Sequence, residues 1–161
     1  MAKLSIKAGI ELLSLIGMLV CLAIPLMFYR QLPDSIAVHF GVYGQPNGWG
    51  PKGILWFISA IATLTYLMMT FAGKVKRGND PKSLAKAKAA EPMLLWLRFE
   101  IAWLLAYIEL MMVRVSLRQA EGLGIWFLPI YLVVILGTVT TGIFKITLAL
   151  KDGNTKPPNE K

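Results

Sequence analysis

The chain has 161 residues, of which 56% are hydrophobic and 16% are charged, and its formal net charge is +8. One cysteine and one histidine exclude an internal disulfide and a zinc centre built from Cys and His ligands. The apolar residues are gathered into long runs, which argues against an ordinary soluble domain and predicts an all-α integral membrane protein.

Four apolar stretches are long enough to be membrane spans, since a helix needs about 20 residues to cross a bilayer. The predicted spans cover residues 6–29, 54–73, 92–117 and 123–150, and together they form a single four-helix domain of residues 1–150. Pro25 should kink the first helix, and Pro92 is well placed as the first residue of the third. The segment SLAKAKAAE before Pro92 predicts a short separate helix, and the tail 151–161 has the composition of disorder.

The distribution of Lys and Arg predicts the orientation. Eleven of the 17 lie in the N-terminal segment, the loop between spans two and three, and the tail, whereas three lie in the other two loops. Positive charge favours the cytoplasmic side, so we expect both termini and the Lys-rich loop to be cytoplasmic in a multi-pass protein of the cell membrane. The lysines should contact anionic lipid, and this accounts for the basic charge without a nucleic-acid partner.

The loop between the first two spans, residues 30–52, is then extracytoplasmic, and its sequence predicts an ordered structure. Residues 36–40 alternate, with Ile36, Val38 and Phe40 on one face and Ala37 and His39 on the other, which indicates a short strand. Asn47 and Gly48 form a strong turn signal. We expect the apolar face to pack on the outer ends of the spans, and Trp49 to lie at the headgroup level.

The segment LPDSIAVHFGVYGQPNGWGPK resembles the signature of a bacterial membrane domain of unknown function, the N-terminal half of SdpI-type proteins. The resemblance implies a role in immunity to a secreted peptide toxin or in signalling. The chain departs from the pattern at Ala37, where Pro is favoured, and at Asn47, where Asp is favoured. The matching positions are Leu32, Pro33, Ile36, His39, Phe40, Gly44, Pro46, Trp49, Gly50 and Lys52.

Five ionisable residues fall inside predicted spans, where burial of each costs at least about 2.5–3.5 kcal/mol at mid-bilayer. Glu11 and Arg98 lie at similar depths on different helices and should form an ion pair. For Glu109 two arrangements are open: a cluster with His39, Arg114 and Asp34 beneath the loop, or a local pair with Arg114 while His39 bonds a loop carbonyl. The five intramembrane polar residues are Glu11, Arg98, Glu100, Glu109 and Arg114.

These features predict a non-enzymatic membrane protein whose outer loop recognises an extracellular peptide. The candidate binding residues are Pro33, Asp34, His39, Phe40, Gly44, Pro46, Asn47, Trp49, Gly50 and Lys52. The alternative is a small proton-coupled transporter or permease subunit that uses Glu109. A membrane enzyme with a His/Glu acid–base pair is a third reading, without support from any catalytic motif. No metal and no cofactor is predicted, and small residues such as Gly137 and Thr141 on the last span favour a helix contact that is internal or joins a homo-oligomer.

Overall fold

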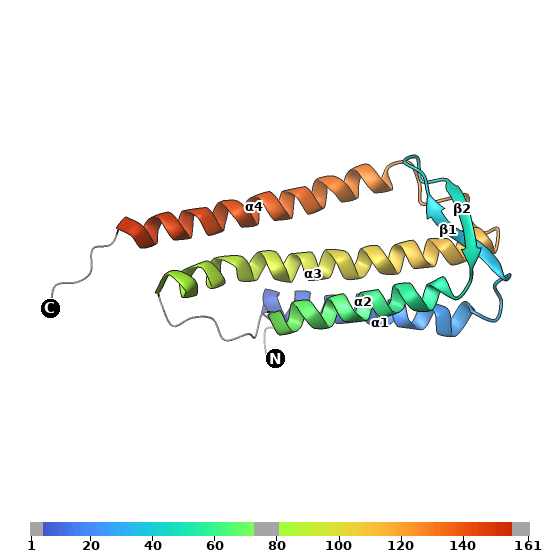
Figure 1. Ribbon diagram of the computed structural model, residues 1–161, viewed down its shortest axis with the longest axis horizontal. Helices are drawn as coiled ribbons and strands as arrows, with labels where there is room; N and C mark the ends of the chain where they lie inside the picture. The colour runs from blue at the N-terminus through green and yellow to red at the C-terminus, as the bar shows by residue number, and fades with distance from the viewer. Residues whose placement is uncertain (1–4, 73–80, 156–161) are drawn as a thin grey trace.

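The computed structural model describes residues 5–72 and 81–155, which form four helices and a two-stranded antiparallel hairpin. The helices lie side by side, and the hairpin is at the end of the bundle opposite to the start of the first helix and the end of the last (Figure 1). In chain order the elements are α1 (Ile6–Phe28), β1 (Ser35–Phe40), β2 (Pro46–Pro51), α2 (Ile54–Ala72), α3 (Pro81–Ser116) and α4 (Phe127–Thr155).

Three of these helices are long and apolar enough to cross a membrane, which indicates a membrane protein. They are α1, α2 and residues Phe127–Lys151 of α4. The Ser5 hydroxyl caps the start of α1 by accepting the Ala8 N–H at 3.2 Å. Pro25 lies inside this helix, and the first two helices end close to the positions expected from their apolar runs.

The boundaries of α3 and α4 differ from the sequence prediction. Pro92 does not begin a helix, because the predicted short helix and the third span are one continuous helix from Pro81 to Ser116. A proline inside a membrane-type helix is tolerated where neighbouring helices compensate for the missing N–H. The last helix begins at Phe127 and continues to Thr155, so residues 151–155, predicted as disordered tail, are helical. Residues 73–80 of the predicted Lys-rich loop and residues 156–161 lie outside the described residues.

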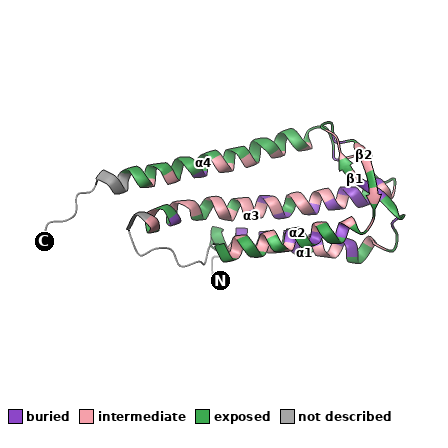
Figure 2. Cartoon of the chain, in the orientation of Figure 1, coloured by how far each residue is buried: buried purple, intermediate pink, exposed green. Residues whose placement is uncertain are grey.

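Helix α3 is the centre of the bundle, since it packs against α1, α2 and α4. Gly17 of α1 brings that helix against Ala102 and Trp103 of α3, and Gly142 of α4 lies against Met93 of α3. The hydrophobic core is near the hairpin end, where the bundle buries Ile24, Leu32, Ile36, Leu55, Met112 and Val113. Most of α4 is exposed, in contrast to the shared faces of α1 and α3 (Figure 2).

The hairpin confirms the predicted strand and corrects the predicted turn. Val38 and Phe40 of β1 pack against the core that contains Ile36, as the alternating pattern indicates. Ala37 is buried as well, in contrast to the predicted alternation, and the pairing of β1 with β2 is irregular on both sides of His39. The reversal is at residues 41–45, where Gly41 N–H donates to the Gln45 carbonyl at 2.9 Å, whereas the Asn47–Gly48 pair lies within β2.

Candidate functional site

The base of the hairpin is closed by Lys52. Its ammonium lies 3.2 Å from the Asp34 carboxylate, donates to the Leu32 carbonyl at 3.3 Å, and lies 5.2 Å from the centre of the Tyr29 ring. The Lys52 N–H also donates to the Asp34 carbonyl at 3.1 Å. Two of the predicted loop residues, Asp34 and Lys52, therefore hold the base of the loop to the end of α1.

The hairpin is also held to α3 along β1. The Ala37 N–H donates to the Ser116 hydroxyl at 3.0 Å, and this hydroxyl donates to the Met112 carbonyl one turn earlier in α3. Together with the fully buried Ile36 side chain, these contacts fix the inner face of the hairpin on the bundle. The loop is thus a folded part of the domain, in contrast to a flexible linker.

The tip of the hairpin rests on the link between α3 and α4. The Leu123 N–H donates to the Gly44 carbonyl at 2.7 Å. The Tyr107 hydroxyl of α3 donates to the Leu123 carbonyl at 2.9 Å, and its ring stacks on Phe127 with 4.4 Å between centroids. The tip is consequently held in a fixed position next to the start of α4.

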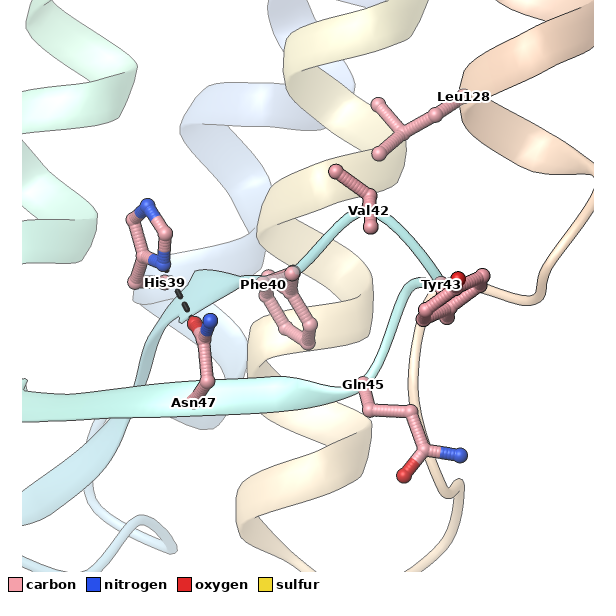
Figure 3. A pocket seen from close by; sticks show the side chains of 8 residues that line it. His39, Phe40, Val42, Tyr43, Gln45, Asn47 and Leu128 are labelled. Atoms are coloured by element: carbon pink, nitrogen blue, oxygen red, sulfur yellow. Dashed lines mark hydrogen bonds between the residues drawn. The ribbon is translucent and has the colours of Figure 1, made fainter.

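A surface cavity of about 910 Å³ opens between the hairpin turn and the start of α4. Figure 3 shows that it is bordered on one side by the His39 ring and the Asn47 amide, and on the other by Val42, Tyr43 and Leu128. The His39 Nδ1 lies 2.5 Å from the Asn47 carboxamide oxygen, which can only accept, so this nitrogen is the donor. The site therefore combines apolar walls with one oriented polar pair, as ligand sites commonly do.

The structure brings some of the predicted loop residues together and separates others. His39, Phe40 and Asn47 share the cavity, whereas Asp34 and Lys52 form the base contact and Trp49 is exposed away from the cavity lining. Pro33 is exposed, Pro46 begins β2 opposite Phe40, and Gly50 pairs with Ile36. The cavity residues that the motif does not include are Gly41, Val42, Tyr43, Gln45 and Leu128.

These additional residues had a weak sequence signal. Val42 and Tyr43 are large apolar residues between two glycines at a turn, and both are strongly exposed, at 74% and 70%. Leu128 belongs to a distant helix, and only the tertiary structure places it beside the turn.

Neither predicted arrangement of Glu109 is formed. Its side chain is fully buried between α1, α2 and α3, where the carboxylate accepts from the Cys21 thiol at 2.9 Å and from the Ser59 hydroxyl at 3.0 Å. Arg114 is exposed, and His39 bonds Asn47. The five-residue separation of Glu109 and Arg114 places them on different faces of α3, and small residues from α1 and α2 surround the carboxylate instead.

The predicted ion pair of Glu11 and Arg98 is confirmed, with 3.8 Å between the Arg98 Nη2 and the Glu11 carboxylate. Arg98 also donates to the Thr70 hydroxyl at 3.0 Å and lies over the Tyr66 ring. It therefore connects α1, α2 and α3. Glu100, two residues later, faces α4, where it accepts from the Thr138 hydroxyl at 2.5 Å.

Among the described residues, no three His, Cys, Asp or Glu side chains gather in a way that could hold a metal ion. The candidate site is the cavity between the hairpin turn and the start of α4, at one end of a helical membrane protein.

Residues 16–63 match the family described as "Domain of unknown function (DUF1648)". The matched segment covers most of α1, the whole hairpin and the first half of α2, and it includes all the loop motif residues. No curated protein and no solved structure matches the chain.

Proposed function

We propose that the protein is a multi-pass protein of a bacterial cell membrane, with α3 as a fourth span and both termini in the cytoplasm. The central position of α3 supports this, because a helix packed against three others of span length shares their direction. The bias of Lys and Arg toward the termini and the 74–88 region supports the orientation. In this arrangement the hairpin is extracytoplasmic, and the lysines of residues 74–88 contact anionic lipid on the cytoplasmic side.

We propose further that the protein is a non-enzymatic receptor whose hairpin cavity binds an extracellular peptide. The observation that carries this proposal is the cavity itself, which is walled by exposed Val42 and Tyr43 and contains the His39–Asn47 pair. Exposed apolar side chains gathered around a polar pair are unusual on a surface that faces water, and such patches often mark interaction sites. The resemblance to SdpI-type proteins favours a role in immunity to a secreted peptide, or in signalling its presence.

Preorganisation supports binding at this site. The hairpin is held at its base by Lys52, along β1 by Ser116, and at its tip by Leu123. A loop that is already ordered loses less conformational entropy when a ligand binds, so more of the contact energy appears as affinity.

The test is selection of peptides from a display library on the full chain in lipid nanodiscs, followed by affinity measurement. His39→Ala and Val42→Ser should each weaken the selected peptides about tenfold or more, as expected for loss of an anchoring contact. Trp126→Ala is the matched control, because Trp126 is 70% exposed near the same end but does not line the cavity. Equal loss of affinity in all three variants, or in none, would contradict the proposal.

Survival of a sensitive host tests the biological role separately. Cells that express the wild-type chain should survive a toxic membrane-active peptide selected in this way, and cells that express His39→Ala should not. If selected peptides bind but give no difference in survival, the protein is a receptor without an immunity role.

A proton-coupled transporter that uses Glu109 is the second candidate. It is favoured by the burial of a carboxylate whose hydrogen-bond donors, Cys21 and Ser59, are both uncharged. Proton flux in proteoliposomes that is unchanged by Glu109→Gln would rule out this role. A homo-oligomer stays a prediction for either function, although Gly142, on the small-residue face predicted for that contact, lies against Met93 of α3.

A further inference from the structure

The contact between α3 and α4 contains a second cavity, remote from the hairpin. It has a volume of about 420 Å³ and includes Met93 and Trp96 of α3 and Gly137 and Thr138 of α4 in its lining. Glu100 also lines it, although this side chain is only 6% exposed. A carboxylate is thus placed at the buried end of a largely apolar cavity.

One oxygen of this carboxylate has no partner. Oε1 accepts from the Thr138 hydroxyl, but Oε2 is buried and makes no hydrogen bond within the described part of the chain. Leaving a charged acceptor unsatisfied is expensive, and such an atom in a native structure calls for an explanation. The Tyr131 hydroxyl, seven residues before Thr138 on α4, is also buried and makes no hydrogen bond to any described residue.

The basic residues nearby do not neutralise Glu100. Arg98 faces the other side of α3, where it contacts Thr70 and Glu11. Lys145 lines the same cavity but is exposed, and among the described residues its ammonium is not within 4.0 Å of any carboxylate. Lys145 is seven residues from Thr138, the partner of Glu100, which is about 10 Å along the helix axis. The Glu100 carboxylate and the Lys145 ammonium therefore lie at opposite ends of the cavity.

We propose that this cavity binds an organic ammonium group that carries hydrogen-bond donors and is attached to an apolar body. The ammonium would donate to the free Oε2 of Glu100 and lie near the Trp96 ring, while the apolar body would occupy the space left by Gly137. Glycine leaves this space open, because a Cβ at Gly137 would meet nothing within 4 Å. The proposal does not depend on peptide binding by the hairpin.

Two kinds of molecule supply this chemistry in a membrane, and they differ in whether Lys145 contributes to their binding. A phosphatidylethanolamine headgroup carries a phosphate next to its ammonium, and Lys145 would contact that phosphate. A free amphiphilic amine has no anionic part, so Lys145 would not contribute to its binding.

The experiment is native mass spectrometry of the full chain in detergent, with added decylamine, decyltrimethylammonium, phosphatidylethanolamine or phosphatidylcholine. We expect one equivalent of decylamine or phosphatidylethanolamine to be retained at least about tenfold more tightly than its trimethylated counterpart, which has no N–H to donate. Glu100→Gln should remove this preference. Glu11→Gln is the matched control, because Glu11 is a half-exposed carboxylate on α1 that does not line the cavity.

Gly137→Leu keeps the proposal testable if Glu100→Gln does not fold. It fills the cavity without altering the carboxylate, and it should abolish retention, whereas Thr140→Leu on the exposed side of α4 should not. Weaker retention of phosphatidylethanolamine by Lys145→Gln than by the wild type would assign the lipid as the source, and unchanged retention of phosphatidylethanolamine would assign the free amine. Equal retention of all four probes, or the same preference in Glu100→Gln as in the wild type, would overturn the proposal.

Discussion

Gly44 and Gly122 lie backbone against backbone, so that a Cβ added to Gly122 would be only 2.1 Å from the Gly44 carbonyl oxygen. Gly44 itself has φ of +79°, and a Cβ there would lie 2.8 Å from the Gly124 carbonyl oxygen. The tip of the hairpin can thus approach the α3–α4 link only because these positions have no side chain. This contact joins the turn that carries Val42 and Tyr43 to the α3–α4 link, close to the start of α4, where Leu128 lines the same cavity.

Gly122→Ala should displace the hairpin tip. The added methyl group cannot be accommodated by rotation of a side chain, because the atom it meets belongs to the backbone, and overpacking of this kind costs about 1–3 kcal/mol. Hydrogen exchange of the Leu123 amide should become faster, since its 2.7 Å hydrogen bond to the Gly44 carbonyl is lost. Gly53→Ala is the control, because a Cβ at Gly53 has no neighbour within 4 Å. Unchanged exchange in Gly122→Ala would show that the contact does not position the tip.

Glu109→Gln and Glu109→Ala should differ strongly. Gln keeps the volume and one oxygen acceptor, so Ser59 can still donate to it, and we expect a change in unfolding free energy below about 1 kcal/mol. Ala leaves a cavity between α1, α2 and α3 and removes the acceptor of the Cys21 thiol, which should cost about 2 kcal/mol or more. Equilibrium unfolding in mixed micelles measures both. A large loss in Glu109→Gln would mean that the carboxylate charge itself is required.

Arg98→Leu should destabilise the bundle because Arg98 contacts α1 and α2 at once. The contacts are the hydrogen bond to Thr70 at 3.0 Å and the ion pair with Glu11 at 3.8 Å. Loss of hydrogen bonds to a charged group predicts about 1.5–3 kcal/mol, measured as a lower midpoint in the same micelle assay. Arg114→Leu on the same helix removes an exposed arginine and should leave the midpoint unchanged. Equal midpoints for the two variants would refute the bridging role.

Single introduced cysteines test the orientation of the hairpin. The natural Cys21 is fully buried, so it should give little background with a membrane-impermeant maleimide. Val42→Cys, at a position that is 74% exposed, should react in intact cells. Lys86→Cys, on an exposed position near the opposite end of α3, should react only after the cells are permeabilised. The reverse pattern would place the hairpin in the cytoplasm and exclude an extracellular ligand for its cavity.

The helices of the first half were evident from the sequence because their signal is local. Uninterrupted apolar runs predict α1 and α2 to within about a residue, and the alternation at Ile36, Val38 and Phe40 predicts β1. Glu11 and Arg98 could also be paired in advance, since their distances from the helix ends place them at the same depth. In each case the deciding quantity was a period or a length along the chain.

Where distant segments meet, only the tertiary structure gave the answer. Asn47 and Gly48 have strong turn propensity, yet pairing with β1 and the contact of Gly44 with the α3–α4 link move the turn to residues 41–45. Glu109 was expected near a charged partner, but the faces that α1 and α2 turn toward α3 surround it with Cys21 and Ser59. The same holds for the free Oε2 atom of Glu100. The packing of α3 against α4 leaves this atom without a hydrogen bond, and no local sequence pattern predicts that packing.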